Sequence, residues 1–285
     1  MITCKEYTEI KKKSLKEDIE KLKRKPTLVV IQIGDNASSN SYIKGKKKDC
    51  EEVGVNFNLL KYEEYITTDE LRKIIVNLNL KDDIDGIIVQ LPVPEHINIK
   101  EIQKVIDPRK DVDGFHPNSF FKPCTPLGVV NYLKYNKYDF TGKNAIVIGR
   151  SDIVGKPLAK MLIDLDATVT LCHSKTDLNK ILDFCPRDII FTCIDKIGYF
   201  DCNNLTQFLY DDIIDIGLGR DKYGKLCGNL SKKLCDEIRE YNKRNVVQYR
   251  TEPILVSGIG GVGLLTRVTL LENILIAHKF KEGEL

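Results

Sequence analysis

The chain has 285 residues, of which 42% are hydrophobic and 30% are charged, and its formal net charge is +3. It is long enough for two domains with substantial cores, and its composition is that of an ordinary soluble globular protein. Because the basic residues are spread along the chain, the small positive charge does not indicate a nucleic-acid partner.

The N-terminus and the cysteines indicate a reducing, cytoplasmic location. Residues 1–13 lack the apolar core of a signal peptide, and we expect no apolar run long enough to cross a membrane. The nine cysteines form no C-x-x-C pair and lie mostly within apolar runs. This pattern favours reduced, buried thiols over disulfides or zinc ligands, so we expect a cytoplasmic protein without a metal site.

Strand-like and helix-like segments alternate along the first half of the chain. Short apolar runs predict buried strands at residues 28–34, 57–62 and 85–91. Helical patterns accompany them at residues 11–24, 39–53 and 68–78. The third strand ends before Pro92, and a charged turn follows at residues 107–114.

The second half continues this alternation after the turn at residues 123–126. Apolar runs predict strands at residues 145–148, 167–172, 188–194 and 212–216. The first two flank a helical segment and form a unit of the size of a βαβ crossover. A glycine cluster at residues 258–263 precedes a final apolar helix that ends near Lys279. The whole pattern predicts an α/β fold with parallel sheets.

The turn after the first strand of the βαβ unit favours an anion site. Gly149, Arg150 and Ser151 end the strand, and Gly155 lies at the start of the following helix. Free backbone N–H groups and the positive end of the helix dipole would face a ligand there. The sequence GRSDIVGKP matches the dinucleotide fingerprint G-x-G-x-x-G only imperfectly, so a βαβ unit without a cofactor is the alternative.

The end of the second strand of this unit favours NADP over NAD. A site for NAD would have Asp or Glu there to bind the ribose 2′-hydroxyl, whereas this chain has Cys172, His173, Ser174 and Lys175. With Arg150 close by at the first turn, this arrangement suits a 2′-phosphate. The sequence therefore predicts NADP as the cofactor.

Tyr42 and Lys46 are the first candidates for a substrate site. They lie four residues apart and would share one helix face, where a phenol beside an ammonium can orient a substrate. Y-x-x-x-K also occurs by chance, so the pair taken alone could be structural. Gln90, Leu91 and Pro92 close the third strand, at the end where ligands bind in α/β folds.

Asp111 and Asp113 add two carboxylates in the charged turn ahead of His116. Acidic turns are usually exposed and structural, and a histidine before a proline is ordinarily a loop residue. The turn indicates a functional site only in combination with the other segments.

Taken in order, these segments resemble the methylenetetrahydrofolate dehydrogenase/methenyltetrahydrofolate cyclohydrolase family. The resemblance covers nearly the whole chain and includes DGIIVQLPVP, PRKDVDGFHPN, PCTP, GRSDIVGKP and CHSKT. It implies a folate-binding catalytic domain of residues 1–124 plus 259–285 and a Rossmann-like NADP-binding domain of residues 125–258. It also implies tetrahydrofolate one-carbon derivatives as substrates, and a homodimer.

The resemblance implies two reactions and a role for each candidate residue. Transfer of a hydride from methylenetetrahydrofolate to NADP needs positioning and no strong base, whereas hydrolysis of the methenyl product to formyltetrahydrofolate needs a proton shuttle. Lys46 matches the catalytic lysine, Gln90 the residue that positions it, Tyr42 the aromatic partner of the substrate, and Asp113 the carboxylate that holds the pterin.

The implied site residues fall into two sets. The catalytic and substrate-binding candidates are Tyr42, Lys46, Gln90, Leu91, Pro92 and Asp113. The cofactor-binding candidates are Gly149, Arg150, Ser151, Gly155 and Ser174, of which Arg150 and Ser174 match contacts to the 2′-phosphate.

Four positions depart from the family pattern. Ile259 and Leu264 replace the prolines of a glycine turn, which could leave that turn less rigid. Asp195 stands where the family has glycine and could crowd the cofactor, and Asn229 replaces an expected aspartate. The alternatives are therefore a cyclohydrolase with weak or lost dehydrogenase activity and a non-catalytic folate- or nucleotide-binding homologue.

A short-chain dehydrogenase is the rival enzyme class, because it also uses Tyr and Lys four residues apart. In that class the glycine-rich turn lies near the N-terminus and precedes Y-x-x-x-K. Here Tyr42 lies far ahead of Gly149, and this order argues against the rival.

Overall fold

The computed structural model of the protein describes residues 1–201, 212–220, 224–244 and 254–285. The chain forms two compact units. Unit A comprises Glu6–Cys124 and Arg267–Leu285, and unit B comprises Met1–Lys5 and Thr125–Thr266. Both contain parallel sheets with helices, which confirms the predicted α/β class.

The units differ from the expected domains at two short segments, residues 1–5 and 259–266, which both belong to unit B. Hydrogen bonds explain the first difference, because Ile2 N donates to Asn136 Oδ1 at 2.8 Å and Tyr132 Oη donates to Ile2 O at 2.7 Å. The second segment ends at Thr266, whose hydroxyl lies 3.1 Å from that of Thr125.

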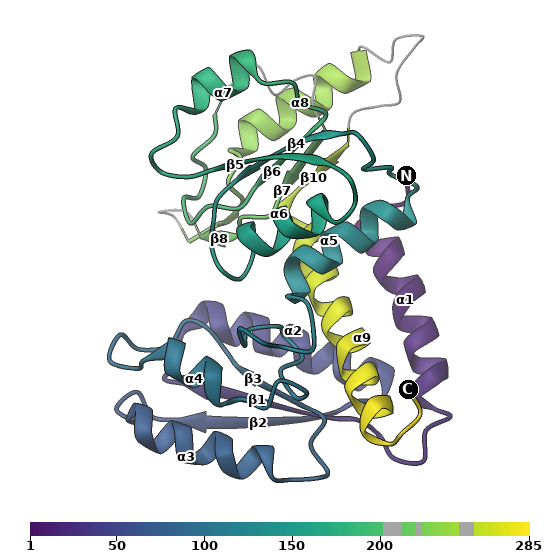
Figure 1. The fold of residues 1–285 in the computed structure, drawn as a ribbon, viewed down its shortest axis with the longest axis vertical. Coiled ribbons are helices and arrows are strands. Elements are labelled where there is room, and N and C mark those ends of the chain that lie inside the picture. The colour runs from purple at the N-terminus through teal and green to yellow at the C-terminus, as the bar shows by residue number, and fades with distance from the viewer. Residues whose placement is uncertain (202–211, 221–223, 245–253) are drawn as a thin grey trace. The chain divides into compact units, whose positions relative to one another are not determined.

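Unit A is built on a three-stranded parallel sheet in the order β2-β1-β3 (Figure 1). The central strand β1 is buried along its whole length, as its run of apolar residues predicted. The strands are β1 (Thr27–Ile33), β2 (Asn56–Tyr62) and β3 (Gly86–Val89). The helices are most of α1 (Cys4–Ile19), α2 (Ala37–Val53), α3 (Thr68–Asn79), α4 (Ile99–Val105) and most of α9 (Gly263–Lys281).

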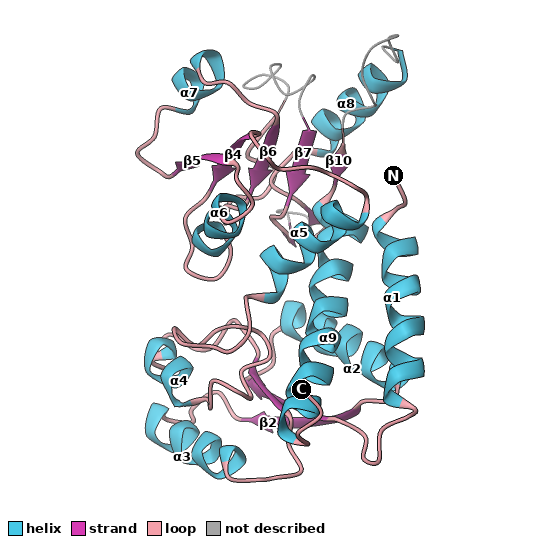
Figure 2. Cartoon of the chain, turned by 45° about the vertical axis from the view of Figure 1, so that its right-hand side comes forward, coloured by secondary structure: helices cyan, strands magenta, loops and turns pink. Residues whose placement is uncertain are grey.

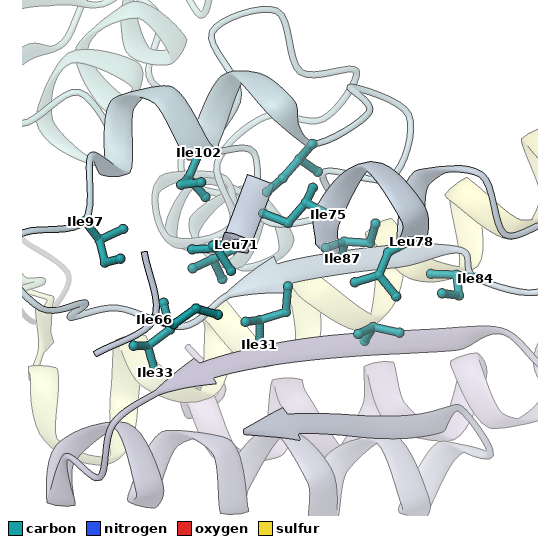
Figure 3. Packing of buried hydrophobic residues seen from close by; sticks show 13 residues of the cluster. Ile31, Ile33, Ile66, Leu71, Ile75, Leu78, Ile84, Ile87, Ile97 and Ile102 are labelled. Carbon is teal, nitrogen blue, oxygen red and sulfur yellow. The ribbon is translucent and has the colours of Figure 1, made fainter. Parts of the chain in front are cut away.

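One face of this sheet packs against α3 and α4 (Figure 3). Ile31 and Ile87 from the strands meet Leu71 and Ile75 of α3 and Ile102 of α4, and all five are buried. Helix α3 supplies this apolar stripe at helical spacing. It begins with a capping box between Thr67 and Glu70, which satisfies free N–H groups of the first turn.

Helix α1 differs from the predicted helix at residues 11–24, because it starts at Cys4 and ends at Ile19. A tertiary contact accounts for the early end. Arg24 lies outside the helix and donates two hydrogen bonds to Asp85, at 2.7 and 2.8 Å. Helix α4 was not predicted, since its seven residues are too few to show a helical period clearly.

Unit B is built on a five-stranded parallel sheet in the order β10-β7-β6-β4-β5 (Figure 2). The strands are β4 (Asn144–Ile148), β5 (Thr168–Cys172), β6 (Ile189–Thr192), β7 (Asp212–Asp215) and β10 (Leu255–Val256). A small antiparallel pair, β8 (Gly219–Arg220) and β9 (Leu226–Cys227), lies apart from this sheet. The helices are α5 (Cys124–Tyr135), α6 (Gly155–Ile163), α7 (Leu178–Phe184) and α8 (Lys232–Arg244).

The order of strands in unit B creates a topological switch point. From β4 the chain goes to β5 on one side and then returns to β6 on the other side. The connections that follow β4 and β6 therefore lead to opposite sides, and this switch point is the usual ligand site of such sheets.

The expectation of no membrane-length apolar run was wrong for one segment. Among the described residues, Gly260–Lys281 has the length and hydropathy of a membrane-spanning helix. However, 61% of its apolar window is buried inside the protein, as in the core helix of a globular fold.

Asp85 carries a fully buried carboxylate in unit A, and we predict that Asp85→Ala destabilises the protein by about 3–5 kcal/mol. Besides Arg24, its fully buried carboxylate accepts from Thr27 N at 2.7 Å and lies 3.3 Å from His278 Nδ1. The variant would remove the acceptor of Thr27 N and leave Arg24 with Glu282 as its carboxylate partner. Urea denaturation measures the loss. The control, Asp83→Ala, removes an exposed carboxylate, and an equal effect of both variants would contradict the prediction.

Candidate functional site

Helix α2 brings Tyr42 and Lys46 to one face of unit A. The helix follows Gly34, which adopts a positive φ of 68° at the end of β1, and Asn36 Oδ1 accepts from Ser39 N in its first turn. The Lys46 side chain is only 7% exposed, whereas Tyr42 is half-buried. Burial raises the pKa of the Tyr42 phenol, so its hydroxyl stays protonated at neutral pH.

Gln90 holds the Lys46 ammonium from the end of β3. Lys46 Nζ donates to Gln90 Oε1 at 3.2 Å. The amide orientation is set by its other end, because Gln90 Nε2 donates to Leu91 O at 2.8 Å. Ser39 Oγ also donates to Leu91 O, at 3.2 Å, and the following Leu91–Pro92 peptide bond is cis. The Leu91 carbonyl thereby fixes which atom of Gln90 faces the lysine.

Asp113 supplies the second oxygen near the ammonium. Its Oδ2 lies 3.8 Å from Lys46 Nζ. The turn continues through Gly114, with a positive φ of 75°, where a Cβ would lie 2.5 Å from the nitrogen of Pro123. Glycine is therefore required for the turn to pack against the segment before α5.

Asp111 has a different role from Asp113, although the two are separated by one residue. It is buried, and its Oδ2 accepts from His116 N at 2.7 Å, which closes the turn. Burial raises the pKa of this carboxyl group. His116 Nδ1 in turn accepts from Asn118 N at 2.9 Å, so both residues stabilise the loop.

Two buried residues that the sequence analysis did not select support the Asp113 turn. Asn273 Nδ2 of α9 donates to Val112 O at 2.9 Å and lies 3.4 Å from Cys124 Sγ. The Cys124 thiol donates to the same carbonyl at 3.2 Å, and its burial raises the thiol pKa well above the usual value. The signal for Asn273 was an amide within the apolar run LLENILIA of the last helix.

Two glycines allow the turn after β4 to pack tightly against neighbouring backbone. Gly149 adopts a positive φ of 129°, and a Cβ on it would overlap the carbonyl oxygen of Cys193. A Cβ on Gly155 would overlap the carbonyl oxygen of Gly149. The Ser151 hydroxyl accepts from Val154 N and Gly155 N, at 3.2 and 3.4 Å, and thus organises the turn itself.

Arg150 and Ser174 lie at the same edge of the unit B sheet. Ile148 of β4 pairs with Cys172 of β5, and each of the two candidates follows its strand by two residues. Both side chains are exposed. His173 and Lys175 are held in the β5 turn by hydrogen bonds to Thr176 Oγ1 and His173 Nδ1, at 3.0 and 3.1 Å.

Asp195 lies beside the switch point. Ile148 pairs with Thr192 of β6, so the exposed Asp195 follows its strand on the other side of β4 from Ser174. Asp195 is therefore at the edge of the sheet where the strands end. Cys193, two residues earlier, is the residue whose carbonyl oxygen a Cβ on Gly149 would overlap.

Asn229 holds the loop that carries Asp195. Its amide donates to Ile194 O at 2.7 Å and to Lys196 O at 2.8 Å, and its Oδ1 accepts from Ile194 N at 3.1 Å. Its own N–H donates to Asp215 Oδ1 at 2.9 Å. Burial raises the pKa of Asp215 to about 6 in spite of these donors. An aspartate at position 229 could not make the two donated bonds.

Ile259 and Leu264, the two departures at the glycine turn, lie in the π-helical turn η2 (Gly258–Val262) and in the first turn of α9. Leu264 is half-buried, while the side chain of Ile259 lies outside the described part. In the parts of the chain that the structure describes, no group of three or more His, Cys, Asp or Glu residues could hold a metal ion.

We predict that Asn229→Asp destabilises unit B, by about 1–3 kcal/mol for each carbonyl oxygen that loses its donor. The side chain is fully buried, so water cannot replace the lost bonds. Chemical denaturation measures the effect, with Asn179→Asp on the exposed surface of α7 as the control. An Asn229→Asp protein as stable as the control would show that the amide bonds contribute nothing.

Comparison with known proteins agrees with the sequence resemblance. Residues 2–113 match the family model of the tetrahydrofolate dehydrogenase/cyclohydrolase catalytic domain, and residues 123–282 match that of the family's NAD(P)-binding domain. The "Bifunctional protein FolD" of Bacillus anthracis is 40% identical over 280 residues, which cover 94% of this chain and 92% of the relative.

Solved structures of the same family superimpose on nearly the whole chain. The bifunctional enzyme FolD from Campylobacter jejuni has a TM-score of 0.84 and 34% identity, with 99% of this chain and 98% of that chain covered. The Trypanosoma brucei methylenetetrahydrofolate dehydrogenase-cyclohydrolase, complexed with NADP and an inhibitor, has a TM-score of 0.83 and 27% identity, with 98% and 97% covered. The chain therefore belongs to the tetrahydrofolate dehydrogenase/cyclohydrolase family of enzymes and carries that family's NAD(P)-binding domain.

Proposed function

We propose that this protein oxidises 5,10-methylenetetrahydrofolate to 5,10-methenyltetrahydrofolate with NADP and hydrolyses the product to 10-formyltetrahydrofolate. Unit A binds the folate and unit B binds the dinucleotide. The observation that carries the proposal is the buried Lys46 ammonium, 3.2 Å from an amide oxygen of Gln90 and 3.8 Å from a carboxylate oxygen of Asp113. Family membership supports it.

For the oxidation, the protein has to position the substrate. Tyr42 presents an aromatic ring and a protonated hydroxyl beside Lys46, and Asp113 presents a carboxylate that can accept two hydrogen bonds from a pterin. Bound NADP supplies the hydride acceptor. No strong base is needed, because a nitrogen lone pair of the substrate expels the hydride.

For the hydrolysis, Lys46 moves a proton. In its neutral form, Nζ takes a proton from the water that adds to the methenyl carbon. This leaves a neutral hydroxyl adduct. Lys46 returns its proton to the ring nitrogen as the carbon–nitrogen bond breaks, and the hydroxyl proton of the adduct leaves to solvent as the formyl C=O forms. The cationic substrate and one water thus give neutral formyltetrahydrofolate and one released proton. Gln90 holds Nζ in place, and the Leu91 carbonyl orients Gln90; Pro92 completes this wall of the substrate site.

The residues of unit B suit NADP. Gly149 and Gly155 allow the turn between β4 and α6 to close tightly, and the Ser151 hydroxyl shapes this turn. Arg150 and Ser174, exposed at one sheet edge, offer a cation and a hydroxyl to the 2′-phosphate.

Asp195 favours one alternative, a cyclohydrolase with weak dehydrogenase activity. A carboxylate at the switch point would repel the phosphates of a dinucleotide. Absorbance assays of the purified protein separate the possibilities. The proposal expects methenyl product from methylenetetrahydrofolate and NADP, and decay of added methenyl substrate faster than the blank. Folate binding without turnover in either assay would favour the non-catalytic homologue.

We also propose a cytoplasmic homodimer with no nucleic-acid or membrane partner. Its support is the family resemblance and the dispersed charge of the chain. Light scattering tests the dimer, and fractionation of cells tests the location.

We predict that Lys46→Met abolishes the cyclohydrolase activity, by about 100-fold or more, and leaves part of the dehydrogenase activity. The reason is that only hydrolysis needs the proton shuttle. The two absorbance assays measure the ratio. Lys44→Met, which changes an exposed lysine of the same helix, is the control. Equal loss of both activities would refute this division of labour.

We predict that Arg150→Ala raises the KM for NADP about tenfold or more and leaves the KM for NAD nearly unchanged. A hydrogen bond to a charged group contributes about 1.5–3 kcal/mol, and only NADP has the 2′-phosphate that would lose it. Steady-state kinetics with both cofactors provide the test. Lys160→Ala, an exposed lysine of α6, is the charge-matched control. An equal rise in the KM values for NADP and NAD would show that the assignment of Arg150 is wrong.

A further inference from the structure

Arg267 of α9, which no assignment above includes, lies directly against the helix that carries Tyr42 and Lys46. A Cβ atom on Gly45 would overlap Nη1 of Arg267 and lie 3.1 Å from its Cζ. Figure 2 shows α2 and α9 as neighbours, in agreement with this contact. The guanidinium therefore rests on the backbone of α2 at a position where any side chain would displace it.

A buried counter-ion, Asp49, holds the guanidinium there. Arg267 Nε lies 2.7 Å from Asp49 Oδ2, the distance of an ion pair, although the angle is not that of a hydrogen bond. Asp49 Oδ1 accepts from Lys12 Nζ at 2.5 Å. Because Asp49 is only 4% exposed, its charge needs such partners, and removing one of them would be costly.

The contact falls in the middle of the functional face of α2. Gly45 and Lys46 each lie three or four residues from Tyr42 and from Asp49, so the four positions fall on one side of the helix. Gly45 is next to Lys46 in the chain. The positive charge of Arg267 also lowers the pKa of Tyr42, opposing the larger effect of burial.

We propose that Arg267 is a positioning residue: seated on Gly45 and held by Asp49, it fixes the face of α2 that presents Tyr42 and Lys46. A planar guanidinium can lie flat on a helix backbone and pair with a carboxylate at the same time. Displacement of reacting groups by about 1 Å can reduce a rate about 100-fold. The inference rests on the proposed function, because it concerns the same substrate site.

Two variants test the positioning role of Arg267, one on each helix of the contact. Gly45→Ala keeps every charge and improves helix propensity by about 1 kcal/mol, but it displaces the guanidinium. Arg267→Met keeps the helix and removes the charge. Both should lower kcat/KM for the folate substrates by about tenfold or more, while the KM for NADP stays within about twofold. The control, Glu272→Gln, breaks the 2.9 Å ion pair of α9 with Lys11 and should change neither parameter.

The readouts separate positioning from a general structural role and from direct substrate binding. Arg267→Met removes a partner of Asp49 and is expected to lower thermal stability, so the stability criterion applies to Gly45→Ala. That variant should unfold no earlier than the parent protein, whereas a global structural defect would lower its thermal stability and affect its NADP kinetics as well. Loss of activity only with substrates that carry glutamate, and not with pteroate analogues, would show instead that Arg267 binds the glutamate. Either result, or activity of both variants within twofold of the parent, overturns the inference.

The dissociation constant for methylenetetrahydrofolate is measured alongside turnover. It should rise in both variants because Tyr42 is misplaced. A parent protein that binds this folate without turnover refutes the proposed function, yet the binding comparison still tests Arg267. Unchanged dissociation constants in the variants would then overturn the inference by themselves.

Discussion

The site of unit A depends on the burial of one ammonium group. A buried cation needs oxygen partners, and Lys46 obtains them from Gln90 and Asp113, which follow it by more than forty residues in the chain. Gln90 can offer its oxygen because its nitrogen is used by the Leu91 carbonyl. Such a chain of fixed donors and acceptors reduces the motion of Nζ, as a proton shuttle requires.

Helix α9 supports this arrangement through the polar exceptions in its apolar sequence. Asn273 binds the carbonyl before Asp113, His278 approaches Asp85 at the base of β3, and Arg267 covers Gly45. Asn273 and His278 are buried, Arg267 is partly buried, and each contacts a different segment of unit A. The helix is therefore apolar enough to pack in a core and polar at the positions that hold the site.

The candidate site of unit B depends on a different constraint: the carboxyl ends of its parallel strands meet at one edge of the sheet. The pairing of β4 with β5 and β6 brings Arg150, Ser174 and Asp195 to that edge. The Asn229 amide makes the loop of Asp195 a defined structure, with bonds that an aspartate could not donate. The departure at Asn229 is thus built into the local hydrogen bonding of unit B.

The sequence by itself determined the α/β class, most strands and the candidate site, because apolar periods, turn residues and the Tyr42–Lys46 spacing are local properties. It also identified the family through segments that remain recognisable in order. Only the tertiary structure decided that Asp111 closes a turn while Asp113 faces the lysine, that α1 ends early where Arg24 reaches Asp85, and that Arg267 lies on Gly45. The physical reason is that a buried polar group bonds to a partner that lies near it in the folded chain, and no local sequence pattern specifies that partner.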